Sequence, residues 1–140
     1  MHAIEAAIRD SETRHEGEIR FAVEAALDPA ALIGRQSARQ RAIDVFSQLR
    51  IWDTEHNNGV LIYLLLADHD VEIVADRGIH ALIGSDEWER ICADMEQAFR
   101  HGRFEEGVIT GIQAVSEHLV KHYPRQGYNP NELPNAPVVL

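Results

Sequence analysis

The chain has 140 residues, the length of one domain, and a domain of this size buries enough surface to hold its own core. Its 45% apolar and 26% charged residues exclude a mostly disordered protein. The 23 acidic and 13 basic residues give a net charge of −10, which argues against a general nucleic-acid-binding protein. The single cysteine, Cys92, excludes an intrachain disulfide and a cysteine-based zinc cluster.

The sequence has no pattern of a secreted or membrane protein. Glu5, Arg9 and Asp10 interrupt the N-terminal residues, so the apolar stretch of a signal peptide does not form there. The longest purely apolar run, residues 60–67, has eight residues, whereas a membrane-spanning helix needs about 20. We therefore expect a cytoplasmic protein without direct membrane insertion.

The first part of the chain predicts a helix, a strand and a second helix. Apolar residues at helical spacing open a helix from residue 4 to about residue 15, and Gly17 is placed to end it. Charged and apolar residues alternate over 18–24, which predicts a strand with one face in water. Ser37 is a candidate N-cap for an amphipathic helix over 38–49.

The middle of the chain predicts a β-hairpin. Residues 60–66 are continuously apolar, as in a central strand covered on both faces. A polar reversal at 68–70 leads to a second arm over 71–75. The helix over 38–49 then joins two strands by a crossover that should be parallel and right-handed. The expected fold class is α/β: a small mixed sheet with helices on both faces (an α/β/α sandwich), with one right-handed βαβ crossover and a β-hairpin.

Two helices and a proline-rich tail complete the pattern. Ser85 is a candidate N-cap for a helix that carries four large apolar side chains inward: Trp88, Ile91, Met95 and Phe99. The last helix, over 104–123, has one apolar face and is stopped by Pro124. We expect one domain over residues 1–124, followed by a Pro-rich tail over 125–140 that is mobile or laid on the surface as an arm.

The loop before the central strand resembles a known family. Residues 52–63 read Trp-Asp-Thr-Glu-His-Asn-Asn-Gly-Val-Leu-Ile-Tyr, a polar loop followed by an Asn-Gly-Val-Leu step and a buried strand. In this loop and strand the chain resembles the TPM domain family. Further matches, in the same order and spacing, are Glu12 with Gly17-Glu18-Ile19, the segment 70–79 and the segment 104–108. The resemblance extends over roughly residues 4–124.

The resemblance implies an α/β/α sandwich and little about activity. Some members of the family bind calcium or magnesium, and a branch in the thylakoid lumen is linked to photosystem repair and described as an acid phosphatase. Where metal-binding members have an acid before the Asn-Gly step, a Gly-aromatic-Gly turn and then a Glu, this chain has Asn57, Asp76-Arg77-Gly78 and His80. Asp86 matches an acid that the family often carries at the next helix start. Many bacterial relatives are secreted or anchored, and this chain looks like a short, soluble branch.

The predicted topology also gathers oxygen-bearing side chains near one end of the sheet. If the two predicted parallel strands pair, the hairpin returns residue 76 to a place beside residue 58. Calcium and magnesium take oxygen ligands from carboxylates, amides and backbone carbonyls. The candidate ligands for Ca²⁺ or Mg²⁺ are Glu18, Asn57, Asn58, Asp76 and Asp86, with Glu16 close to them. The alternative is that Asn57-Asn58-Gly59 forms a turn and that Asp76 and Asp86 are helix caps.

Two further sets of residues have the composition of metal ligands. Asp28 and residues 68–70, at the opposite rim, suit a cation, although polar residues are expected at a turn. His118 and His122 stand four residues apart, as two ligands of one metal do. They lack the Glu of a zincin motif and flank the core face of their helix, which favours surface or boundary positions.

Three other features have both a functional and a structural interpretation. Gly34-Arg35-Gln36-Ser37 precedes a helix and could attract an anion, but without P-loop spacing it is better explained as a capped loop. Cys92 is expected to be a small core residue rather than a nucleophile. Trp52 and Trp88 are candidates for an interface or for packing over the edge of the core.

The sequence therefore favours a non-enzymatic binding or accessory module of the TPM type. Its expected partner is a protein or a membrane-associated assembly, with a divalent cation as a possible regulator. The alternative is a weak metal-dependent acid phosphatase in which Asp76 and Asp86 hold the ion. A third possibility is a structural subunit, which predicts an obligate oligomer.

Overall fold

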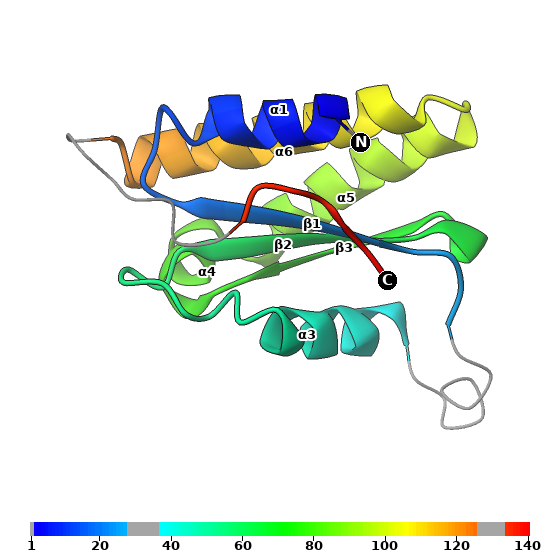
Figure 1. Cartoon of the computed structure of the whole chain (residues 1–140), viewed down its shortest axis with the longest axis horizontal. Helices are drawn as coiled ribbons and strands as arrows, with labels where there is room; N and C mark the ends of the chain where they lie inside the picture. Colours follow the sequence, from blue (N-terminus) through cyan, green and yellow to red (C-terminus); the bar gives the residue numbers. More distant parts are fainter. Residues whose placement is uncertain (1, 28–36, 126–133) are drawn as a thin grey trace.

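The computed structural model describes residues 2–27, 37–125 and 134–140. They contain a four-stranded mixed sheet in the spatial order β3-β2-β1-β4 (Figure 1). The strands are β1 (Glu18–Glu24), β2 (Gly59–Leu65), β3 (Asp70–Ala75) and β4 (Val138–Val139). β1 pairs in parallel with β2 and with β4, and β2 pairs antiparallel with β3. The predicted mixed sheet, parallel crossover pair and hairpin are confirmed.

Helices cover both faces of this sheet, as predicted (Figure 1). One face is covered by α1 (His2–Ser11), α5 (Ser85–Arg100) and α6 (Phe104–His122), and the other by α3 (Ala38–Gln48). A short helix, α4 (Arg77–Ile83), follows β3, and a 3₁₀ turn, η1 (Leu66–Asp68), joins β2 to β3. No helix within the described ranges combines the length and the apolar composition needed to cross a membrane.

Two apolar clusters, one on each face of the sheet, hold the layers together. Ile19, Phe21 and Val23 of β1 pack toward α1, α5 and α6. Ala22, between them, packs with the α3 side. Every residue of β2 is buried, which confirms the predicted central strand. Full burial of a large apolar side chain contributes about 1.5–3 kcal/mol, so this strand is a main source of stability.

The predicted wet face of β1 is wrong. Glu18 and Arg20 are only 2% and 7% exposed. Arg20 Nη1 donates to the Pro134 carbonyl at 3.0 Å, and the Glu24 carboxylate accepts from Arg41 of α3 at 2.9 and 3.1 Å. The charged residues of β1 do share one face, but helix α3 and the C-terminal segment cover it. Alternation in sequence cannot distinguish a face in water from a face that other elements cover.

The first helix ends at Ser11, earlier than the predicted end near residue 15. His15 is fully buried, pairs as an isolated bridge with Pro124, and contacts the Ser11 hydroxyl at 2.8 Å through Nε2. Because this bridge needs extended backbone, the helix cannot continue through His15. Gly17 therefore does not end the helix. It is a glycine because a Cβ at this position would lie only 2.6 Å from Leu119 Cδ2.

Helix α4 was not predicted as an element, although the alternative interpretation of Asp76 as a helix cap is confirmed. The Asp76 side chain caps it by accepting from the Arg77 N–H at 2.8 Å. Gly84, with φ of 88°, separates α4 from α5 and occupies the N-cap position that was predicted for Ser85. Ser37, by contrast, caps α3 as predicted, because its hydroxyl accepts from the Gln40 N–H.

Strand β4 has no counterpart in the sequence-based prediction. Val138 pairs with Ala22 of β1, and the Leu140 N–H donates to the Val23 carbonyl at 2.9 Å. Residues 138–140 therefore extend the sheet beyond β1. Residues 126–133 of the predicted tail lie outside the described residues.

Candidate functional site

The end of the sheet where β1 and β2 begin and β3 ends is called here the amino edge. The strand register sets Glu18 beside Gly59 and Val60 beside Ala75. The Asp76 N–H donates to the Gly59 carbonyl at 2.9 Å, and the Glu18 N–H donates to the Asn58 carbonyl at 3.4 Å. Parallel strands start at one edge and an antiparallel hairpin returns to it, so Glu18, Asn58 and Asp76 meet there, as the topology predicted.

The loop that carries Asn58 is held tightly against the start of α4. The Asn57 carbonyl accepts from the Gly78 N–H at 3.0 Å and from the Ile79 N–H at 3.3 Å. A Cβ on Gly78 would lie 2.8 Å from the carbonyl oxygens of both His56 and Asn57. A Cβ on Gly59 would overlap the Ile51 carbonyl oxygen. These two glycines are therefore required by close backbone approach.

Two buried oxygen atoms at the amino edge lack a hydrogen-bond partner within the described part of the chain. Asn58 is fully buried, and its Nδ2 donates to the Glu16 carbonyl at 3.1 Å, while its Oδ1 is unpaired. Asp76 Oδ1 caps α4, whereas its Oδ2 is buried and unpaired. The Asp76 charge also contributes, after burial, to a raised pKa of the Tyr123 hydroxyl. The edge thus holds unused oxygen acceptors and a negative charge.

A pair of carboxyl groups, Glu12 and Glu18, lies at the same edge, where β1 begins. Burial, a hydrogen bond from one carboxyl group to the other and the charge of Glu18 raise the pKa of Glu12 to about 9. Glu12 Oε2 also accepts from the Ile19 N–H at 3.1 Å. The two groups therefore share a proton at neutral pH. Sequence reasoning used Glu12 only as a mark of the family, because no periodicity links it to Glu18.

The other two predicted ligands are placed differently. The Asn57 side chain is exposed, and its φ of 52° is the left-handed conformation that asparagine tolerates in turns. Asp86 is exposed in the first turn of α5, beyond α4. Within residues 2–27, 37–125 and 134–140, no three His, Cys, Asp or Glu side chains gather as metal ligands. Any cation site at this edge must therefore include amide or backbone oxygens.

The opposite rim and the histidine pair of α6 do not form metal sites within the described residues. Asp68 and His69 are exposed around η1, and Asp28 lies outside the described residues. His118 Nε2 is 3.0 Å from Glu87 Oε1, and its ring packs edge-on against Trp88. His118 is thus engaged by α5 and does not pair with His122.

Of the three remaining sequence features, Ser37, Cys92 and Trp88 have structural roles, and the interface predicted for Trp52 stays a prediction. Residues 34–36 lie outside the described residues, and Ser37 is the cap of α3. Cys92 is buried, and burial raises the pKa of its thiol to about 12, as expected for a core residue. Trp52 is half-exposed, whereas Trp88 is buried over the core.

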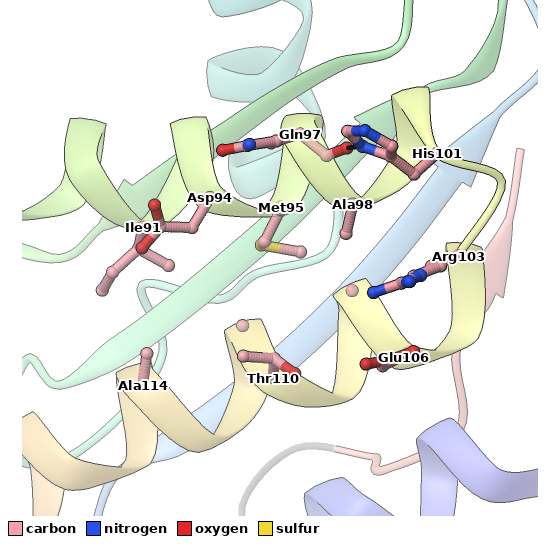
Figure 2. A pocket seen from close by; sticks show the side chains of 12 residues that line it. Ile91, Asp94, Met95, Gln97, Ala98, His101, Arg103, Glu106, Thr110 and Ala114 are labelled. Atoms are coloured by element: carbon pink, nitrogen blue, oxygen red, sulfur yellow. Dashed lines mark hydrogen bonds between the residues drawn. The ribbon is translucent and has the colours of Figure 1, made fainter.

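A groove of about 430 Å³ opens between α5 and α6 (Figure 2). Figure 2 shows Met95 and Ala98 of α5 pointing toward α6. The helices approach closely here, since a Cβ on Gly107 would lie 2.9 Å from the Ala98 Cβ. Charged side chains of both signs, among them Asp94 and Arg103, line the groove. It contains none of the predicted ligand residues.

Comparison with known proteins gives a family match and several similar solved structures, among them the following two. The sequence profile of the TPM domain matches residues 2–118. The NMR structure of BA42 protein from the psychrophilic bacterium Bizionia argentinensis is 33% identical, with a TM-score of 0.86, over 99% of this chain and 90% of that chain. The N-terminal domain of a protein from P. gingivalis has the same fold at 18% identity and a TM-score of 0.67, over 88% of this chain and 76% of that chain. No curated protein sequence matches.

The profile covers most of the chain, including the loop, both hairpin strands and all of helix α5. The similarity to BA42 extends over nearly the full length at more than 30% identity. The chain therefore belongs to the TPM domain family, as the resemblance in its sequence indicated.

Proposed function

We propose that this chain is a non-enzymatic binding module that takes Ca²⁺ or Mg²⁺ at the amino edge and presents the ordered edge to a protein or a membrane-associated assembly. The observation that carries the proposal is the pair of buried acceptors, Asn58 Oδ1 and Asp76 Oδ2, without a partner among the described residues. A buried polar atom left unpaired costs about 1–3 kcal/mol. A bound cation removes that cost for both atoms at once.

The proposed ligand set is the one that the sequence suggested: Glu18, Asn57, Asn58, Asp76 and Asp86. Its chemistry suits a hard cation, since it offers carboxylate, amide and backbone oxygens and no sulfur or imidazole. Hydrogen bonds from Gly78 and Ile79 hold the Asn57 carbonyl, so the loop is ordered before any ion arrives. The exposed side chains of Asn57 and Asp86 are proposed to approach the ion from the solvent side.

Binding is favoured over catalysis because neither Cys92 nor His15 is activated as a nucleophile or a base. The Cys92 thiol stays protonated at neutral pH, as its raised pKa requires. Burial lowers the pKa of His15 to about 4, and its two ring nitrogens already contact Ser11 and Gly17. The alternative function is a metal-dependent acid phosphatase with the ion held by Asp76 and Asp86. Absence of phosphomonoester turnover by the metal-loaded chain between about pH 5 and pH 8 contradicts that alternative.

Thermal unfolding with and without the ions tests the proposal. A ligand that binds only the folded chain stabilises it by about 2.7 kcal/mol at a hundredfold excess over Kd, which raises Tm. Asp76→Asn keeps the acceptor for the Arg77 N–H and removes the charge, so its Tm should no longer respond to Ca²⁺ or Mg²⁺. Asp94→Asn, at an exposed position of α5, is the matched control and should respond as the wild type does. A wild-type Tm that ignores both ions contradicts the proposal.

A further inference from the structure

The outer edge of β3 is a second surface, separate from the proposed cation ligands. β3 is the last strand on its side of the sheet, so its outward backbone groups have no neighbouring strand within the described residues. Side chains take that place. The Val71 N–H donates to Glu96 Oε2 at 3.1 Å, and the Ile73 carbonyl accepts from Arg39 Nη1 at 2.6 Å. An open edge strand is a template for pairing with another chain, and here its groups are held by side chains that can move away.

A groove of about 660 Å³ runs along this edge between β3 and α5. Four carboxylates line it: Asp70, Glu72, Glu89 and Glu96. Arg39 is the one arginine or lysine among its described lining residues. Burial, and then the neighbouring carboxylates, raise the pKa of Glu72, and burial and Asp70 act in the same direction on Glu96. Four acidic side chains thus share the groove with one arginine, and a basic occupant would stabilise the charged forms of carboxyl groups whose pKa values are raised there.

A buried hydrogen-bond donor lies in one of the residues that line the groove. Trp88 lines it and is 4% exposed, and its Nε1–H is buried without an acceptor in the described part of the chain. A buried donor of this kind is normally paired.

We propose that this groove binds an extended, Lys- or Arg-containing segment of a partner protein, which adds to β3 as a further strand. The backbone of the segment replaces Glu96 at the Val71 N–H and Arg39 at the Ile73 carbonyl. Glu96, once released, pairs with a basic side chain, as do Glu72 and Glu89. Backbone pairing provides affinity in this mode of recognition, and alternate side chains provide specificity.

A second copy of the chain fits the same edge poorly. Pairing of β3 with β3 brings two copies of Asp70 and Glu72 together, and like charges across an interface are unfavourable. The charge of the groove therefore selects a basic partner over self-association.

The probe is a synthetic peptide of alternating Lys and Val, about eight residues long, to span the six residues of β3. Its control has the same sequence with alternate backbone nitrogens methylated, which keeps the charge and prevents strand pairing. Titrated into ¹⁵N-labelled chain in EDTA, the first peptide should saturate, shift the amides of Val71 and Ile73 and slow their hydrogen exchange. The methylated peptide should do neither.

A charge variant adds a second readout. The double substitution Glu72→Gln and Glu89→Gln should weaken peptide binding roughly fivefold to tenfold, whereas Glu105→Gln with Glu117→Gln, at exposed sites of α6, should leave it unchanged. Equal binding of the methylated peptide, equal binding to both double variants, or a β3-paired dimer that excludes the peptide overturns the proposal. Because EDTA is present throughout, this result is independent of the cation proposed for the amino edge.

Discussion

The shared proton of Glu12 and Glu18 predicts how the stability of this chain depends on pH. The unfolded Glu12 has an ordinary carboxyl pKa, but in the folded chain burial and the Glu18 carboxyl group raise the pKa of Glu12 to about 9. Between these two values the folded state binds a proton that the unfolded state has lost. The corresponding stabilisation is fully present below the unfolded pKa and is lost as the pH rises toward the folded pKa.

Glu12→Gln removes this dependence with little change of shape. The amide oxygen still accepts from the Ile19 N–H, and the amide nitrogen replaces the shared proton as a donor to Glu18. One proton contributes about 1.4 kcal/mol per pH unit, or about 2.7 kcal/mol between pH 6 and pH 8. The free energy of unfolding of Glu12→Gln, relative to wild type, should therefore rise by about 2.7 kcal/mol over that range.

Urea unfolding in EDTA, followed by tryptophan fluorescence at the two pH values, measures this difference. Trp88 is buried over the core, so its emission should report global unfolding. Glu105→Gln, at an exposed position of α6, is the control and should follow wild type at both pH values. Contributions of His15 and Cys92 cancel in the comparison because every variant retains them. If Glu12→Gln follows wild type from pH 6 to pH 8, the two carboxyl groups do not share a proton.

Three further substitutions or reactions test other parts of the structure. Tyr63→Phe removes the hydroxyl that donates to Glu24 Oε1 at 2.6 Å in the interior. Urea unfolding should show that the free energy of unfolding falls by about 1.5–3 kcal/mol. An unchanged free energy would mean that this hydrogen bond does not stabilise the fold. Gly78→Ala forces a Cβ against two carbonyl oxygens. The free energy of unfolding should fall by about 1–3 kcal/mol, despite the better helix propensity of alanine, and amides in the loop before β2 should shift. An unchanged free energy of unfolding would show that the loop is free to move. Cys92 should react with thiol reagents at neutral pH no faster than the chain unfolds, because it is buried and its thiol is protonated; rapid labelling of folded protein would contradict its placement.

The parts of the fold that sequence predicted are those in which one physical signal dominates. The continuous apolar run of β2 can only be buried on both faces, and its pairing with β1 and β3 follows from the lengths of the connections. The N-cap and apolar face of α3, and the apolar stripe of α6, are similarly local signals. For the same reason Glu18, Asn58 and Asp76 were predicted to meet at one edge.

The parts that sequence missed depend on contacts between distant residues. The end of α1 is set by the bridge between His15 and Pro124, which are 109 positions apart in the chain. The covered face of β1 depends on Arg20 reaching Pro134, and β4 depends on pairing with a strand from the start of the chain. Helix α4 was hidden by Gly78, whose small size serves a close approach rather than a turn.

In the candidate site, too, local sequence signals predicted the backbone, whereas contacts between distant residues could not be predicted. Its backbone was predictable from the Asn-Gly step and the hairpin. The unpaired Asn58 Oδ1 and Asp76 Oδ2 were not, because only the fold decides which acceptors find partners. The pairing of Glu12 with Glu18 likewise required the three-dimensional arrangement.

The most direct test of the central claim is a titration of Ca²⁺, and then Mg²⁺, into ¹⁵N-labelled apo protein, followed by backbone amide shifts. The account predicts saturable shifts confined to residues 57–59, 76–78 and 86, which should vanish in Asp76→Asn. It is contradicted if these amides do not move at millimolar ion, or if shifts are spread over the acidic surface and persist in Asp76→Asn.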